Sequence, residues 1–154
     1  MPHVSMEYAI MVPILLVQVI LIPVAAGWMM ETWVTRRREI ALRDVASQIG
    51  TTIQQLYFSL HPKEIGAGTT TQAANVPPFI ESIPYFITAS ARKVENSTML
   101  YLHLALMGVD TTAAARVTLG PNVLWQQSMF VSNSTSASVR VQKLSNGTLS
   151  FSFG

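Results

Sequence analysis

Residues 8–30 read YAIMVPILLVQVILIPVAAGWMM, a run that contains no Asp, Glu, Lys or Arg. As an α-helix, 23 residues would extend roughly 34 Å at about 1.5 Å per residue, which is enough to cross a lipid bilayer. The sequence therefore predicts a long apolar helix near the start of the chain. Pro13 and Pro23 each remove one helical hydrogen bond and are candidate kinks.

The composition of the whole chain agrees with an apolar excess concentrated in one place. Charged residues make up 12% of the 154 residues, and the mean hydropathy is +0.35. Soluble domains usually carry about twice that share of charge. The net charge is only +2, with acids and bases interleaved, so we expect no nucleic-acid partner. The chain has no cysteine, which excludes disulfides and thiolate metal sites.

Three kinds of segment share this apolar pattern: a cleaved secretory signal, a permanent membrane anchor, and a helix that leaves the membrane to be buried in an assembly. Residues 24–26, Val-Ala-Ala, would suit signal cleavage. The run is longer than a typical signal core, however, and no basic residue precedes it. We therefore expect the segment to be retained.

The helical pattern continues past the apolar run. In residues 31–61 apolar residues recur at steps of three and four: Leu42, Val45, Ala46, Ile49, Ile53, Leu56 and Leu60. Gly50 weakens this helix by about 1 kcal/mol relative to Ala, and Pro62 should end it. We expect one assembly helix over residues 1–61. Its four arginines, at positions 36, 37, 38 and 43, are expected to form a solvated face.

The remainder of the chain predicts β-structure. Residues 62–84 are rich in Gly, Thr and Pro and are expected to be a connector. Residues 85–154 are expected to form an extracellular head of six antiparallel strands, at 85–94, 98–107, 114–119, 123–131, 137–144 and 148–153. The clearest hairpin signal is Asn146-Gly147. The predicted fold class is α+β, with the head a β-sandwich or partly open barrel.

Residues with catalytic chemistry are scattered. His3, His61 and His103 have no metal-ligand spacing, and there is no phosphate-binding loop or nucleophile elbow. Five carboxylates fall in separate segments without an evident partner: Asp44, Glu64, Glu81, Glu95 and Asp110. We therefore expect no enzyme, no metal and no cofactor.

Three triplets in the β-region fit the N-glycosylation pattern, beginning at Asn96, Asn133 and Asn146. Each lies at a predicted turn, which indicates a glycosylated domain outside the membrane, although unmodified loops would read the same way. Arginines directly after the apolar run would instead favour a cytoplasmic head. A basic leader that has been removed, or a final location in a filament, would resolve this conflict.

A single acid, Glu7, lies next to the apolar helix in VSMEYAIMVPILLVQVILIPVAAG, residues 4–27. This pattern resembles the N-terminus of type IV pilin-like proteins, and the plan of the chain is most similar to archaeal type IV pilins and the related archaellins. The resemblance covers roughly residues 3–60 as a pattern. It implies a structural subunit whose helices bundle in the core of an extracellular filament, after insertion in the membrane.

The resemblance also implies roles for residues and partners. Glu7 would be the family's acid that guides subunits into the filament, and the assembly segment would include Tyr8, Pro13, Gln18, Pro23 and Gly27. The implied partners are identical copies, a prepilin peptidase, an assembly ATPase and a platform protein. Two departures from the family pattern stand out: no basic leader is visible, and Glu7 would be fifth only in a chain that begins at His3.

Two functions from different classes follow. The first is a subunit of a filament for adhesion, with an archaellum as the motile version. The second is a single-span membrane protein with an external binding domain. We expect the apolar stripe of residues 42–60 to separate them, because a plain anchor does not need it.

Overall fold

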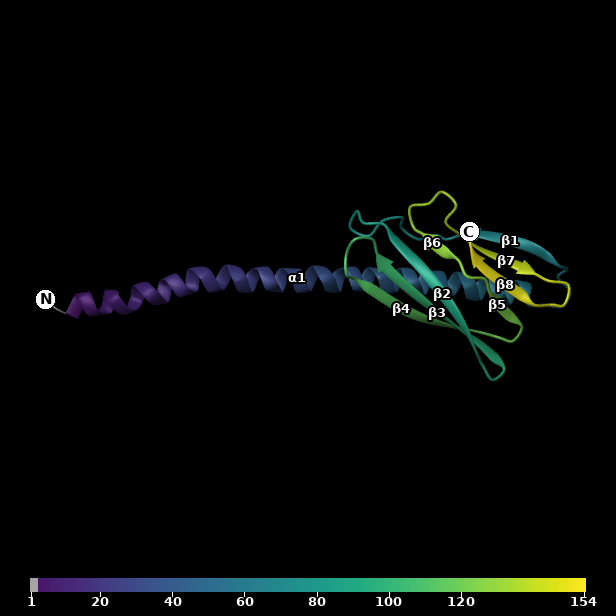
Figure 1. Ribbon diagram of the computed structural model, residues 1–154, viewed down its shortest axis with the longest axis horizontal. Coiled ribbons are helices and arrows are strands. Elements are labelled where there is room, and N and C mark those ends of the chain that lie inside the picture. The colour runs from purple at the N-terminus through teal and green to yellow at the C-terminus, as the bar shows by residue number, and fades with distance from the viewer. Residues whose placement is uncertain (1–2) are drawn as a thin grey trace. The chain divides into compact units, whose positions relative to one another are not determined.

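The structure is a computed structural model that describes residues 3–154, with side chains described from Tyr8 onward. It contains one long helix, α1 (His3–Leu60), followed by eight strands, β1 to β8. The chain divides into two compact units, Met1–Arg37 and Arg38–Gly154. The predicted α+β class is confirmed to that extent, because a long helix is followed by two mainly antiparallel sheets (Figure 1).

The helix is continuous through both internal prolines, Pro13 and Pro23. It ends where the sequence predicts, because Pro62 lacks the N–H that a further helical turn would use. The last helical hydrogen bond at this end runs from the backbone N–H of His61 to the carbonyl oxygen of Tyr57, at 2.8 Å. The two prolines inside the 58-residue helix, unlike Pro62, do not end it.

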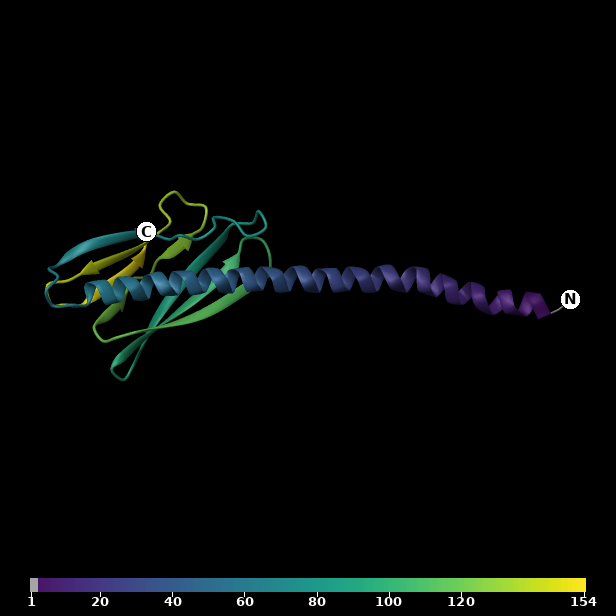
Figure 2. The same ribbon diagram turned by 180° about the vertical axis from the view of Figure 1, so that it is seen from behind.

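The part of α1 that belongs to the second unit is two-faced, as the three-four spacing predicts. Its apolar face is buried against the strands of the same chain and consists of Leu42, Val45, Ala46, Ile49, Ile53, Leu56 and Tyr57, with Leu60 half-buried. The opposite face is exposed and mostly polar, with Ser47, Thr51 and Gln55. It also carries the exposed apolar side chains of Ile40 and Phe58. Figure 2 shows this part of the helix running along the sheets.

The strands form two sheets of four. One has the order β1 (Gly68–Ala73), β7 (Ser138–Lys143), β8 (Leu149–Phe153) and β5 (Val123–Trp125). The other has the order β4 (Thr112–Leu119), β3 (Ser97–Leu106), β2 (Tyr85–Val94) and β6 (Met129–Val131). Neighbouring strands are antiparallel, except that β5 and β8 are parallel. Side chains from both sheets and from α1 belong to one hydrophobic core.

The head differs from the prediction in two places. Strand β1 lies inside the range 62–84 that we expected to be a connector, and it pairs with β7. The predicted strand 123–131 is two strands, β5 and β6, which belong to different sheets. The chain changes sheet across residues 126–128, where the Ser128 hydroxyl oxygen accepts a hydrogen bond from the backbone N–H of Phe153 at 2.8 Å.

The predicted hairpin at Asn146-Gly147 is confirmed and connects β7 to β8. Gly147 has a φ of 81°, a left-handed conformation that glycine adopts without steric cost. Strand β7 alternates, with Val139 and Val141 buried and the residue between them exposed. Strand β8 does not, because Ser150 is buried beside Phe151. The hairpin and β7 are therefore well specified by local sequence.

Candidate functional site

The largest uncovered apolar surface of the described chain is the helix of the first unit. Its large apolar side chains from Tyr8 to Met30 are all at least 50% exposed. They include Ile10, Met11, Val12, Ile14, Leu15, Leu16, Val17, Val19, Ile20, Leu21, Ile22, Val24, Trp28 and Met29. Consecutive residues are exposed, so this helix is apolar on every side, and no part of the first unit covers it.

An exposed surface of this kind needs an apolar environment. Burying one large aliphatic or aromatic side chain is worth about 1.5–3 kcal/mol relative to leaving it in water. Monomeric soluble proteins rarely expose contiguous apolar patches larger than a few hundred Å². By length and composition, α1 could cross a membrane. Lipid tails or the helices of other copies would provide the cover that the chain itself does not.

The structure places the predicted assembly residues as follows. Tyr8 and Gln18 are exposed, and a Cβ atom at Gly27 would meet nothing within 4 Å. Pro13 and Pro23 are exposed positions within the continuous helix. The side chain of Glu7 lies outside the described residues, so its predicted pairing stays a prediction.

Two tryptophans mark the end of the apolar segment. Trp28 is 72% exposed and Trp33 is 65% exposed. The guanidinium carbon of Arg37 lies 6.0 Å from the ring centroid of Trp33, at the outer limit of a cation–π contact. Tryptophan and arginine in this order are typical of the boundary between lipid tails and head groups.

The two helical arginines of the second unit, Arg38 and Arg43, are in ion pairs. The Nε of Arg38 lies 2.7 Å from the Oε2 of Glu81, and a guanidinium nitrogen of Arg43 lies 2.6 Å from the Oε1 of Glu39. Arg36, Arg37 and Arg43 are exposed, as expected of a solvated face, whereas Arg38 is half-buried in its contact with Glu81. Glu81, expected to have no partner, contacts Arg38.

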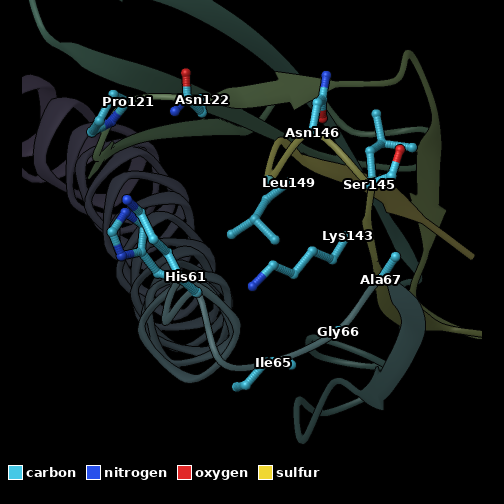
Figure 3. A pocket seen from close by; sticks show the side chains of 13 residues that line it. His61, Ile65, Gly66, Ala67, Pro121, Asn122, Lys143, Ser145, Asn146 and Leu149 are labelled. Atoms are coloured by element: carbon cyan, nitrogen blue, oxygen red, sulfur yellow. The ribbon is translucent and has the colours of Figure 1, made fainter.

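A cavity of about 410 Å³ lies between the end of α1 and the β7–β8 hairpin (Figure 3). His61, Asn122, Lys143 and Asn146 are among its lining residues. The ammonium group of Lys143 donates hydrogen bonds to the carbonyl oxygens of Leu60, at 2.8 Å, and Pro62, at 2.7 Å. This buried cation therefore satisfies carbonyls at the helix C-terminus, where positive charge is favourable.

Catalytic chemistry is not concentrated anywhere in the described residues. Among residues 8–154, no three His, Asp or Glu side chains lie close enough to hold a metal ion. Desolvation raises the pKa of Tyr85 to about 12. It also raises the pKa of Tyr57 above its usual value, against a smaller opposite effect of the Gly120 backbone. His103 is exposed on β3. The expected absence of enzyme activity stays a prediction.

The contacts of Lys143 and Glu81 were not predicted from the sequence. Lys143 shares an alternating face with Val139 and Val141, so the two-residue period already placed it inward. Glu81 and Ser82 both have positive φ, 49° and 68°, and they connect the paired residues Ile80 and Ile83. Neither residue type signals such a turn, so the sequence held no indication that Glu81 would reach Arg38.

The predicted glycosylation residues Asn96, Asn133 and Asn146 are all exposed. They lie in three separate connections: β2–β3, β6–β7 and β7–β8. Within the described part of the chain, the three asparagines therefore lie apart and form no common site. No protein-family model, curated protein or solved structure matches this chain.

Proposed function

We propose that this chain is a structural subunit that polymerises through its N-terminal helix into an extracellular type IV pilus-like filament used for surface attachment. The observation that supports this most is that the charge-free helix over residues 8–30 is exposed on every side. The second unit, in contrast, has a closed core of its own. The chain therefore combines a folded head with an apolar helix that requires cover from lipid or from other copies.

Identical helices would cover one another along their whole apolar length. At about 1.5–3 kcal/mol for each buried large side chain, a bundle of such helices would be a durable polymer. Gln18 is the one strongly polar residue within the run, and in a bundle its amide would find a partner on a neighbouring helix. The acid before the run, Glu7, would pair with the α-amino group of an adjacent copy. A buried carboxylate is costly without such a partner.

The polymer would form from subunits that are first inserted in the membrane. A prepilin peptidase, an assembly ATPase and a platform protein are the partners that this proposal requires. The head would lie outside the cell. We further propose that its two sheets form a β-sandwich-like head, because the inward residues of both sheets share one core.

A single-span membrane protein with an external head is the second candidate. Trp28 and Trp33 favour it, because a pair of exposed tryptophans at the end of an apolar span is typical of a helix that stays in a bilayer. The stripe of residues 42–60, which we expected to separate the two functions, does not do so. Its apolar side chains fill the core of their own head, so they serve either function equally.

Electron microscopy decides between the two candidates. Material sheared from the cell surface would be examined by negative stain, and the protein in the filaments would be identified by mass spectrometry. We expect thin filaments built from this chain. A protein that stays in the membrane fraction as a single copy in detergent, with lipid around residues 8–30, would contradict the filament and support the anchor.

A further inference from the structure

We infer that Asn133 is the glycan acceptor of this head and that the fold protects Asn96 from modification. The inference depends on the proposed function only in requiring that the head reach the outer side of the membrane. The three N-x-Ser/Thr triplets cannot be distinguished by sequence. The structure separates them, because the pattern requires a hydroxyl two residues after the asparagine, and that hydroxyl must be within reach of the enzyme.

The triplet at Asn96 has its hydroxyl inside the protein. Asn96 lies at the tip of the β2–β3 hairpin, but Thr98 is already in β3 and is 2% exposed. Its Oγ1 is fully buried and has no hydrogen-bond partner among the described residues. Thr98 is opposite Lys93 on one side and Leu119 on the other. An enzyme could contact this hydroxyl only after the central strand of a sheet had opened.

The triplet at Asn146 is exposed but held in a tight turn. The backbone N–H of Thr148 donates to the Oδ1 of Asn146 at 3.0 Å. Two backbone hydrogen bonds of 2.9 Å, from Leu144 to Thr148 and from Gly147 to Leu144, close the same turn. The side chain of Thr148 is half-buried. These hydrogen bonds would have to break before Asn146 could accept a glycan.

The triplet at Asn133 has neither a buried hydroxyl nor a hydrogen bond to its asparagine side chain among the described residues. Its turn is closed only by longer backbone hydrogen bonds, from the N–H of Ser134 to the carbonyl oxygen of Val131 at 3.1 Å and from the N–H of Ala137 to the carbonyl oxygen of Ser134 at 3.3 Å. Asn133, Ser134 and Thr135 are all exposed, in the loop 133–137 that extends away from the sheets between β6 and β7 (Figure 1). The side-chain hydrogen bonds of this loop join Ser134 to Ser136 and Ser138 to Ser136. Asn133 and Thr135 are left exposed to solvent.

Both ends of this loop are fixed to the head, because the loop follows Ser132 and leads into β7 at Ser138, whose carbonyl oxygen accepts a hydrogen bond from the backbone N–H of Gly154 at 3.0 Å. The Ser132 hydroxyl donates to the carbonyl oxygen of Pro78 at 2.7 Å and accepts from the backbone N–H of Tyr85 at 2.9 Å. The loop can therefore bind in the active site of a glycosylating enzyme while the sheets stay intact.

The donor in this reaction would be an oligosaccharide linked through phosphate to a lipid. The carboxamide nitrogen of Asn133 attacks the anomeric carbon of the sugar, and a C–N bond forms. The bond from that carbon to the phosphate oxygen breaks, and the lipid phosphate leaves with the electron pair. The nitrogen loses one of its two protons to solvent, so no oxidant or reductant is needed.

The test compares the folded chain with its own peptides. The folded full-length protein in detergent would be incubated with a purified oligosaccharyltransferase and its lipid-linked donor. The sites would be mapped by mass spectrometry after trypsin digestion. Cleavage after Lys93, Arg116, Arg140 and Lys143 puts each triplet in a separate peptide, 94–116, 117–140 and 144–154. The unmodified digest would serve as the unfolded control.

We expect the folded chain to be modified at Asn133 at least about tenfold faster than at Asn96, since each factor of ten corresponds to about 1.4 kcal/mol of opening free energy. In the digest this preference should disappear. Asn133→Gln should remove the main product, and Asn96→Gln should leave it unchanged. Equal modification of Asn96 and Asn133 in the folded chain would overturn the inference.

The same peptide map of protein isolated from its native cells gives the second measurement. We expect glycan on peptide 117–140 and none on peptide 94–116. A bare Asn133 in that protein would overturn the inference. Filaments made of bare protein would leave the proposed function standing, so the two failures can be told apart.

Discussion

Gly50 of α1 lies directly against Val117 of β4. A Cβ atom at position 50 would come within 2.9 Å of the Cγ2 of Val117, closer than real side chains approach. The helix and this sheet are also joined by a hydrogen bond of 3.4 Å from the Gln54 amide to the carbonyl oxygen of Thr118. Gly50, which costs helix stability locally, therefore permits the close packing of α1 on the head.

Gly50→Val should destabilise the head. The added side chain would overlap Val117, and overpacking of this kind costs about 1–3 kcal/mol. Thermal unfolding of the full chain in detergent, followed by near-ultraviolet circular dichroism, would measure the lowered midpoint. Gly27→Val is the matched control, because nothing lies within 4 Å of a Cβ at that helical glycine. Unchanged unfolding of Gly50→Val would show that the helix does not approach β4 so closely.

Lys143→Met should destabilise the end of α1. Methionine keeps most of the side-chain volume but leaves the carbonyl oxygens of Leu60 and Pro62 without the ammonium donor. The loss should be about 1–3 kcal/mol in unfolding free energy. Amide hydrogen exchange of residues 57–61 should speed up as well. Lys63→Met, at an exposed lysine that lines the same cavity, should change neither measurement.

Tyr85 should make the head sensitive to alkaline pH. Its phenol is buried and donates a hydrogen bond to the carbonyl oxygen of Pro77 at 2.7 Å, and burial raises its pKa from 10.0 to about 12. The raised pKa stabilises the fold fully below pH 10, and that contribution is lost as the pH rises through about 12. The ultraviolet absorbance of the ionised phenol would follow this titration.

Tyr85→Phe separates the titration from the packing. It should cost about 1 kcal/mol at neutral pH through the lost hydrogen bond. It should also flatten the fall in unfolding midpoint between pH 10 and 12. Tyr101→Phe, at a partly exposed residue of β3, is the control. An equally steep alkaline loss in Tyr85→Phe would mean that another group controls it.

Glu7→Ala should leave the protein in the membrane and stop filament growth. Without the carboxylate, an incoming subunit lacks the group that would pair with the α-amino group of its neighbour. Membrane fractionation would report insertion, and negative-stain microscopy of sheared material would report assembly. Glu31→Ala removes an acid from the other end of the apolar segment and should assemble normally. Normal filaments from Glu7→Ala would contradict the role assigned to this residue.

Local patterns in the sequence predicted much of this fold. Residues 8–30 lack charge, and residues 42–60 have three-four spacing, so the helix and its buried face followed directly. The hairpin at Asn146-Gly147 followed from turn chemistry. Strand β1 could not be found in this way, because all six of its residues, GTTTQA, are exposed and show no apolar alternation. Only its pairing with β7 makes it a strand.

The functional features were also predictable only in part. The exposed apolar helix and the three acceptor triplets were visible in the sequence. Which triplet is accessible was not visible, because the burial of Thr98 depends on its two neighbouring strands. The split of 123–131 into β5 and β6 likewise depends on long-range pairing. Each strand has only three residues, too few to show a period.

The placement of residues 38–60 inside the head has a practical consequence for protein production. A fragment that begins at β1 would lack the helix that covers one side of the core. Core residues such as Val117 and Leu119 would then be exposed to water. Such a fragment should aggregate. A fragment that begins at Arg38 lacks the apolar segment and keeps the helical part of the core, so it should be the more soluble form for crystallisation.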